Sequence, residues 1–249
     1  MSFTDQGESL LEKPMDKSMD KSELSIVIIG DSNTEGYGLE AGESYPELLN
    51  LWFKKEIVVH NFGVSGTCVI QKDILGRWVG MPYVHEPAYR KALAVKGDIY
   101  IINLGTNDAT DGEEDINSDN DSDINPFGNL MAYSDYFASQ YEGIIEEIYA
   151  ASPNAKIMVC LPIPIRNSIW RKHKQIYLEV LAQDIRSISE KRNLKCIDLM
   201  DSFLQIEDID RLYLSDGLHL NSKGAAYVAK IIKEALCMEG LYSESDSVE

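Results

Sequence analysis

A run of aliphatic residues that stops at a Gly-Asp-Ser triplet constrains the fold of this chain more than any other feature. Residues 26–29 read Ile-Val-Ile-Ile, which is typical of a strand buried on both faces of a sheet. Gly30 ends the run, and Ser32 follows where the chain leaves the sheet. The Ser32 hydroxyl is therefore expected at the carboxyl edge of a strand, where it either caps the next helix or takes part in chemistry.

Apolar runs of this kind alternate with helical patterns along the chain. The predicted strands lie near 25–29, 57–61, 99–104, 156–161 and 195–199. The predicted helices lie near 44–55, 86–95, 129–151, 168–192 and 222–237. Strands that alternate with helices indicate βαβ units, so we expect an α/β fold with a parallel sheet covered on both faces.

A second motif, near the C-terminus, contains an acid and a base. Asp216 and His219 are three residues apart, so their side chains can share one face of a turn. A serine nucleophile needs a base to take its proton, and the imidazole needs an acceptor that fixes its tautomer. The same pair is also compatible with a surface histidine and a helix-capping aspartate.

Two more strand exits carry groups that can stabilise an oxyanion. Asn107 follows the predicted strand at 99–104, and its amide can donate a hydrogen bond without titrating near neutral pH. Gly66 follows the strand at 57–61, and its backbone N–H can approach a substrate oxygen without steric hindrance from a side chain. Each motif alone is compatible with an ordinary turn, but together they fit one hydrolytic site.

These four motifs resemble the blocks of the GDSL or SGNH hydrolase family, which is named for a Ser, a Gly, an Asn and a His. The matching residues, in the family's order, are 30–34, 61–66, 105–108 and 216–219. Asn33 stands where many members carry Leu or Ile, a position outside the four functional ones. The resemblance covers about residues 24–238 and implies a three-layer α/β/α sandwich. Its flavodoxin-like parallel sheet would have five strands in the order 2-1-3-4-5.

The resemblance also implies an activity and a set of site residues. It implies an esterase or lipase-type acyl hydrolase, with Ser32 as nucleophile, His219 as base and Asp216 as its partner. The oxyanion hole would consist of the backbone N–H groups of Ser32 and Gly66 and the side chain of Asn107. No cofactor or metal is expected.

Two aromatic-containing segments, 76–83 and 161–170, follow strand ends towards the expected site. They look like loops of family members that act on acetylated carbohydrates, including sialate O-acetylesterase-like proteins. Trp78 and Trp170 are candidates for stacking on a sugar or for packing beneath a loop, and Arg166 is a candidate for binding a carboxylate. We expect a short-chain ester, an acetyl group on a sugar or glycan, as substrate. The alternatives are a lysophospholipase or thioesterase, a silent carbohydrate-binding protein of the same fold, or a flavodoxin-like ligand-binding module.

Composition limits the partners and the compartment. The net charge of −18 argues against binding to nucleic acid or to anionic membranes. No apolar segment approaches the roughly 18 residues of a membrane span, and no export signal is seen, so the cytoplasm is expected. Secretion is the alternative if the natural protein carries further residues before Met1. We expect a flexible N-terminal arm at 1–23, one hydrolase domain at 24–238 and a C-terminal tail at 239–249. The oligomeric state is left open.

An acidic insertion at 111–125 directly follows the Asn107 block. Its alternating Asp and Asn residues resemble a calcium loop, but Asn120 and Pro126 replace the glycine and the closing glutamate that such a loop needs. We therefore expect a solvated loop. The four cysteines show no metal or redox spacing and are expected to be reduced; Cys68, close to Gly66, is a minor alternative nucleophile.

Overall fold

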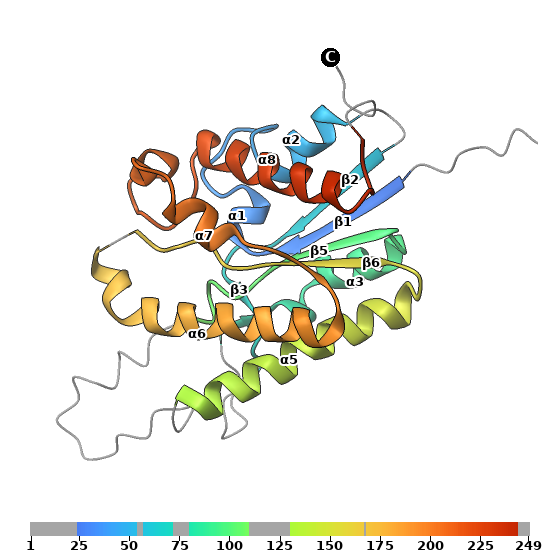
Figure 1. Cartoon of the computed structure of the whole chain (residues 1–249), viewed down its shortest axis with the longest axis horizontal. Coiled ribbons are helices and arrows are strands. Elements are labelled where there is room, and N and C mark those ends of the chain that lie inside the picture. The colour runs from blue at the N-terminus through green and yellow to red at the C-terminus, as the bar shows by residue number, and fades with distance from the viewer. Residues whose placement is uncertain (1–23, 54–56, 72–79, 110–129, 167, 244–249) are drawn as a thin grey trace, which may run out of the picture.

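The computed structural model describes residues 24–53, 57–71, 80–109, 130–166 and 168–243 (Figure 1). Of the predicted features, the N-terminal arm at 1–23, the acidic insertion at 111–125 and Trp78 lie outside the described residues. Trp170 belongs to a described helix, but its side chain lies outside the description.

Five parallel strands form the central sheet. Across the sheet they follow the order β2 (Ile57–Gly63), β1 (Leu24–Gly30), β5 (Ile99–Asn103), β6 (Lys156–Cys160) and β7 (Lys195–Ile197). Counted along the chain within this sheet, the order is 2-1-3-4-5. The predicted parallel five-stranded α/β sandwich is confirmed. A second, two-stranded sheet pairs β3 (Thr67–Cys68) with β4 (Met81–Pro82).

Helices cover both faces of the central sheet (Figure 1). One layer contains α3 (Pro87–Val95), α5 (Leu130–Ala151) and α6 (Ser168–Arg192). The opposite layer contains α2 (Tyr45–Trp52), α7 (Leu199–Leu204) and α8 (Ser222–Met238). The three layers that the family resemblance implies are therefore present.

Strand β1 shows why its sequence is apolar at every position. Val27 and Ile29 pack in the hydrophobic cluster under α3, α5 and α6, whereas Ile26 and Ile28 pack in the cluster under α2 and α8. Successive side chains of a strand point to opposite faces, so a strand between two helical layers must be apolar on both. Burying each such side chain contributes about 1.5–3 kcal/mol.

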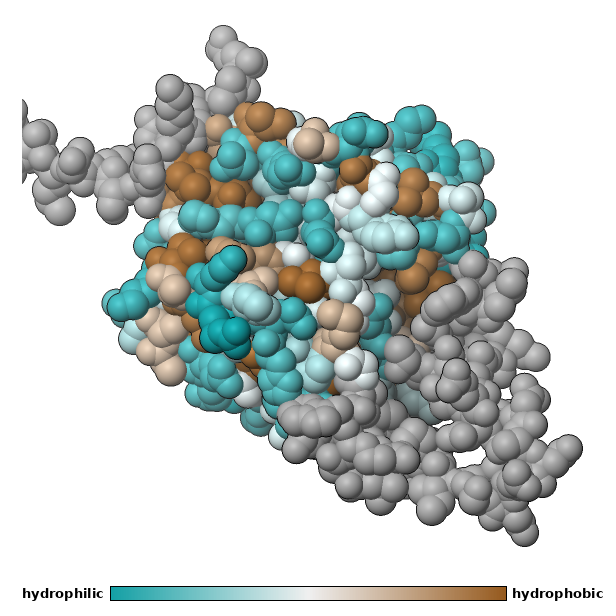
Figure 2. All heavy atoms as spheres, turned by 180° about the vertical axis from the view of Figure 1, so that it is seen from behind, coloured by the Kyte–Doolittle hydropathy of each residue, from teal (hydrophilic) through white to brown (hydrophobic). Residues whose placement is uncertain are grey.

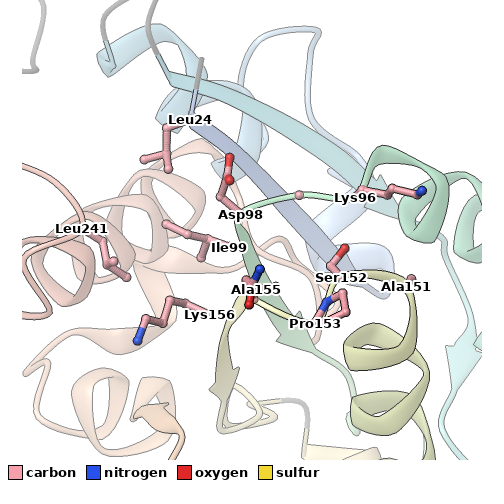
Figure 3. Close-up of a pocket in the computed structure, with 12 residues that line it drawn as sticks. Leu24, Lys96, Asp98, Ile99, Ala151, Ser152, Pro153, Ala155, Lys156 and Leu241 are labelled. Atoms are coloured by element: carbon pink, nitrogen blue, oxygen red, sulfur yellow. The ribbon is translucent and has the colours of Figure 1, made fainter. Parts of the chain in front are cut away.

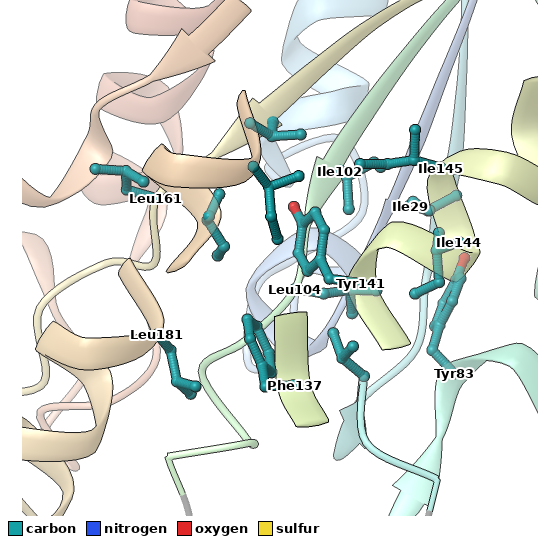
Figure 4. Close-up of a cluster of buried hydrophobic side chains, with 14 of the residues drawn as sticks. Ile29, Tyr83, Ile102, Leu104, Phe137, Tyr141, Ile144, Ile145, Leu161 and Leu181 are labelled. Carbon is teal, nitrogen blue, oxygen red and sulfur yellow. The ribbon is translucent and has the colours of Figure 1, made fainter. Parts of the chain in front are cut away.

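The first of these clusters is built around the aromatic face of α5 (Figure 4). Phe137 and Tyr141 are fully buried, and their ring centroids lie 5.6 Å apart. Both rings come from α5, while Ile102 of β5 and Leu181 of α6 join the same cluster. Their spacing of four residues places both rings on one face of the helix, which is the periodicity that predicts this helix from sequence.

The strand register brings the carboxyl ends of three strands to one level. Gly30 of β1 pairs with Gly63 of β2 on one side and with Asn103 of β5 on the other. A Cβ atom at Gly63 would lie 2.1 Å from the backbone nitrogen of Glu35. Glycine at this position therefore lets the one-turn helix α1 (Ser32–Glu35) pack directly against the end of β2.

Several short helical elements have no counterpart in the sequence prediction. They are α1, α7, and the 3₁₀ turns η1 (Tyr83–His85) and η2 (Ile209–Leu212). One or two turns contain too few residues to show a helical period, so only tertiary packing reveals them. On the face shown in Figure 2, hydrophobic side chains form small groups among hydrophilic ones. No helix in the described part of the chain is long and apolar enough to span a membrane.

Candidate active site

Ser32 lies at the junction of β1 and α1, where the sequence predicts a hydroxyl at the carboxyl edge of the sheet. It is the first residue of α1 and is 7% exposed. The helix cap is the preceding residue, Asp31, whose Oδ1 atom accepts the N–H of Asn33 at 3.0 Å. Because Asp31 already caps the helix, the Ser32 hydroxyl is not needed for that purpose.

His219 and Asp216 lie beside this hydroxyl. The Nε2 atom of His219 is 3.0 Å from the Oγ atom of Ser32, and its Nδ1 atom is 2.7 Å from the Oδ2 atom of Asp216. Three side chains thus form a continuous hydrogen-bonded series from hydroxyl to carboxylate. Although Ser32 and His219 are 187 residues apart in sequence, the fold places a hydroxyl, an imidazole and a carboxylate within reach of one another, the three groups that serine-dependent acyl transfer requires.

The carboxyl group of Asp216 organises its own loop. Its Oδ1 atom accepts the backbone N–H groups of Leu218 and His219, both at 2.9 Å. Partial burial raises the pKa of Asp216, but the hydrogen bonds from the His219 side chain and from the two backbone N–H groups outweigh it. The pKa of Asp216 therefore lies below its ordinary value, and the group is ionised at neutral pH. An ionised carboxylate holds the imidazole with its Nδ1–H towards the acid and its Nε2 towards Ser32.

Tyr37 lies on the solvent side of His219. The two ring centroids are 4.3 Å apart, and the planes are inclined by 34°. Tyr37 is 53% exposed, so one part of its ring contacts the imidazole and another faces solvent. The residue therefore forms part of the exposed surface beside His219, a position that the sequence patterns did not identify.

Two backbone N–H groups, those of Ser32 after β1 and of Gly66 after β2, are candidates for meeting an oxyanion. Gly66 is exposed and has φ of +77°, a conformation that favours glycine. In the described part of the chain, the N–H groups of Ser32 and Gly66 donate to no protein acceptor. The preceding residue, Ser65, donates its N–H to the Oε2 atom of Glu35 at 2.8 Å, which ties the Gly66 loop to α1.

The third expected donor, Asn107, reaches the same loop. Its Nδ2 atom donates one hydrogen to the backbone oxygen of Thr67 at 2.9 Å. An amide has two N–H donors, so this bond orients the group and leaves the second N–H for another acceptor. The structure therefore brings the predicted Ser32, Gly66 and Asn107 to the same edge of the sheet.

Two buried carboxyl groups, Asp31 and Asp108, support these loops. Both residues are 2% exposed. Asp108 accepts hydrogen bonds from the backbone N–H groups of Val69 and Ile70 at 2.8–2.9 Å. Burial raises the pKa of Asp108 to about 7, although these hydrogen bonds lower it. Burial likewise raises the pKa of Asp31 to about 6, although the hydrogen bond from the N–H of Asn33 lowers it. The sequence patterns assigned no role to either aspartate. For Asp31, the available signal was a carboxyl group directly after an apolar strand, whereas Asp108 lies five residues beyond the end of β5.

Arg166 lies beside the loop that carries Asp216, and its side chain already forms an ion pair. Its Nε donates to Asp210 Oδ1 at 2.7 Å, and its backbone N–H donates to Gly217 oxygen at 2.7 Å. A cavity of about 420 Å³ is lined by Arg166, Asp210 and Asp216, among others. The predicted Arg166 is thus near Asp216. The side chains of Trp78 and Trp170, also proposed from sequence, lie outside the described part of the structure.

A larger cavity, of about 560 Å³, lies at the end of the sheet opposite to Ser32 (Figure 3). It is lined by residues from the amino ends of the strands, such as Leu24, Ile99 and Lys156. The hydroxyl, imidazole and carboxylate described above lie at the carboxyl ends. Size alone therefore does not locate the candidate site in this fold.

Cys68 does not have the environment of a nucleophile. The residue is 4% exposed, and burial raises the pKa of its thiol to about 12, so the thiolate is scarce at neutral pH. All four cysteines are described, and they form no disulfide. Among the described residues, no cluster of three or more His, Cys, Asp or Glu side chains is placed to hold a metal ion.

Comparison with known proteins identifies a family. The GDSL-like Lipase/Acylhydrolase family matches residues 28–227. An acetylxylan esterase from Xylanibacter ruminicola is 30% identical over 216 residues, which make up 86% of this chain. This chain spans 43% of the length of that relative.

Solved structures with the same fold include two hydrolases. A lipase/acylhydrolase from Enterococcus faecalis superposes with a TM-score of 0.61 at 20% identity, covering 89% of this chain and 98% of the other. An acetyl xylan esterase named AlAXEase superposes with a TM-score of 0.60 at 18% identity, covering 86% of this chain and all of the other. At such identities the superpositions show the shared fold.

Proposed function

This chain belongs to the GDSL-like lipase/acylhydrolase family, a family of carboxylic ester hydrolases, and from that premise we propose that it is a serine esterase with Ser32 as nucleophile. The observation that carries the proposal is the hydrogen-bonded series Ser32–His219–Asp216, with distances of 3.0 and 2.7 Å. A protein that only binds a ligand has no need of a base aligned with a hydroxyl.

The first step forms an acyl-enzyme. His219 Nε2 takes the hydroxyl proton as Ser32 Oγ forms a bond to the ester carbonyl carbon. Negative charge develops on the carbonyl oxygen, where the N–H groups of Ser32 and Gly66 and the amide of Asn107 can donate to it. The intermediate collapses by breaking the bond to the alcohol oxygen, and His219 gives that oxygen its proton.

The second step reverses these roles with water. His219 takes a proton from water as the water oxygen attacks the acyl carbon. The bond to Ser32 Oγ then breaks, and His219 returns the proton to that atom. Asp216 stays ionised and stabilises the imidazolium that forms in each step, which agrees with its lowered pKa.

We propose an acetyl ester on a carbohydrate as the substrate. The relative that is 30% identical over most of this chain is named an acetylxylan esterase. The half-exposed ring of Tyr37 beside His219 can pack against the apolar face of a sugar. Met81, another exposed apolar side chain at 46%, lies next to Gly66. A net charge of −18 favours a small-molecule or glycan ester over an anionic polymer.

Ser32→Ala tests the proposal. Loss of the nucleophile should lower kcat for p-nitrophenyl acetate by about 10⁴–10⁶-fold without a change in Tm. Ser187→Ala, an exposed serine on α6, is the matched control and should keep full activity. A fluorophosphonate should label the wild type at Ser32. Residual activity above a few per cent in Ser32→Ala contradicts the assignment.

A substrate panel tests the ester class. Acetylated xylan and acetylated monosaccharides should be turned over with higher kcat/KM than long-chain p-nitrophenyl esters or lysophospholipids. The reverse order would favour a lysophospholipase or thioesterase. Absence of turnover on every ester would favour a silent carbohydrate-binding protein.

A further inference from the structure

Asn33, the residue directly after the candidate nucleophile, contacts the loop that carries the base. It is 6% exposed on α1. Its Oδ1 atom accepts the backbone N–H of Leu220 at 2.9 Å, and its Nδ2 atom donates to the backbone oxygen of Leu218 at 3.4 Å. These two backbone groups flank His219, so one side chain contacts the loop on both sides of the base.

Several hydrogen bonds within residues 214–219 shape this loop. Asp216 accepts the N–H groups of Leu218 and His219 as well as the imidazole Nδ1–H. At its back, the N–H of Leu214 donates to the backbone oxygen of His219 at 2.8 Å. These bonds fix the imidazole relative to Asp216 and to residues on the far side of the loop. None of them fixes it relative to Ser32.

Hydrogen bonds from α1 to this loop connect the base directly to the segment that carries the nucleophile. Three such hydrogen bonds occur in the described part of the chain: the bond between Ser32 and His219, and the two bonds of Asn33. The first is lost during turnover, because Ser32 Oγ has no hydrogen to donate once it carries the acyl group. The two bonds of Asn33 do not involve Ser32 Oγ, so acylation does not remove them.

We propose that Asn33 is a positioning residue that holds the His219 loop against α1 while Ser32 is acylated. The proposal rests on the proposed function, since it assigns the stage of that reaction in which Asn33 matters most. Displacement of a reacting group by about 1 Å costs on the order of 10²-fold in rate. Deacylation should therefore depend on Asn33 more strongly than acylation, in which the Ser32–His219 bond is still present.

The test compares Asn33→Leu with Asn33→Asp and a matched control. Leucine has a similar size but makes no hydrogen bond, whereas aspartate keeps an acceptor for the N–H of Leu220. Thr34→Val is the control, because Thr34 is the next buried residue of α1 and its hydroxyl bonds to Tyr45 at 2.7 Å, away from the loop. Pre-steady-state hydrolysis of p-nitrophenyl acetate separates acylation from deacylation.

We expect kcat of Asn33→Leu to fall about 10²-fold, with a burst of p-nitrophenol and a lower KM as the acyl-enzyme accumulates. The kcat of Asn33→Asp should be at least tenfold higher than that of Asn33→Leu, and Thr34→Val should behave as wild type. A purely structural defect would lower Tm or the active fraction without producing a burst. The low-field NMR signal of the His219 Nδ1–H should persist in Asn33→Leu, since the bond to Asp216 is internal to the loop.

The proposal is overturned if folded Asn33→Leu keeps kcat within threefold of Thr34→Val, or if its kcat falls without a burst. Loss of the Nδ1–H signal would overturn it too, because the loop would then have collapsed as a whole. Should Asn33→Leu not fold, Asn33→Ser replaces it, since the shorter hydroxyl cannot bridge to Leu220, and the same outcomes apply. Ser32→Ala is measured in parallel: an active Ser32→Ala refutes the proposed function, whereas an inactive one with an unaffected Asn33→Leu refutes only the role of Asn33.

Discussion

Asp108→Asn should change how the stability of this protein depends on pH. The wild-type carboxyl group is 2% exposed, and burial raises its pKa from 3.8 to about 7, against the hydrogen bonds from Val69 and Ile70. The folded state therefore binds this proton more tightly than the unfolded state does. Between the two pKa values the native group is protonated while the unfolded one is ionised, so stability falls as pH rises and levels off above about pH 7.

The size of the effect follows from the two pKa values. Each pH unit within that interval costs about 1.4 kcal/mol of unfolding free energy, so the wild type loses about 2–3 kcal/mol between pH 5 and pH 8 through this group. Asparagine does not titrate, and Asp31, which is also buried with a raised pKa, is present in both proteins. The stability advantage of the wild type over Asp108→Asn should therefore shrink by about 2–3 kcal/mol over this range.

Urea unfolding at pH 5, 6, 7 and 8 measures this difference, provided that the m-values of the two proteins agree. Asp208→Asn, at an exposed position, controls for the loss of one negative charge. A difference between wild type and Asp108→Asn that stays constant within about 0.5 kcal/mol across the range, or that widens as pH rises, would refute the reasoning.

Two further experiments address the site and the packing beneath it. His219→Ala should lose more activity than Asp216→Ala, because His219 transfers protons in both steps and Asp216 only orients it. The Ser32→Ala/His219→Ala double variant should be hardly less active than either single variant. Additive losses of kcat would contradict the view that the two residues act as one unit. Gly63→Ala should destabilise the fold by about 1–3 kcal/mol, because its Cβ would meet the α1 backbone, whereas Gly143→Ala in α5, where a Cβ has open space, should stabilise it by about 0.5–1 kcal/mol. Chemical denaturation measures both, and equal effects would contradict the close approach at Gly63.

The strands and long helices could be predicted because each shows the local spacing of apolar side chains that is typical of its type. The aliphatic run at 26–29 corresponds to β1, and the helical pattern at 222–237 corresponds to α8 within one residue. The site motifs were also recognisable, since each begins directly after such a strand or before such a helix. Asn33 shows the limit of this reasoning. Its position next to Ser32 was plain, but its contacts are with Leu218 and Leu220, far away in sequence.

The sequence by itself determined which segments are buried strands and where each strand ends, because side-chain polarity and glycine placement are local properties. Only the tertiary structure decided which of those ends meet. Parallel pairing of β1 with β2 and β5 aligns Gly30 with Gly63 and Asn103. Packing of α8 on the sheet then brings His219 to within 3.0 Å of Ser32. These contacts depend on the register and order of strands that are distant in the chain, and no local pattern encodes such distances.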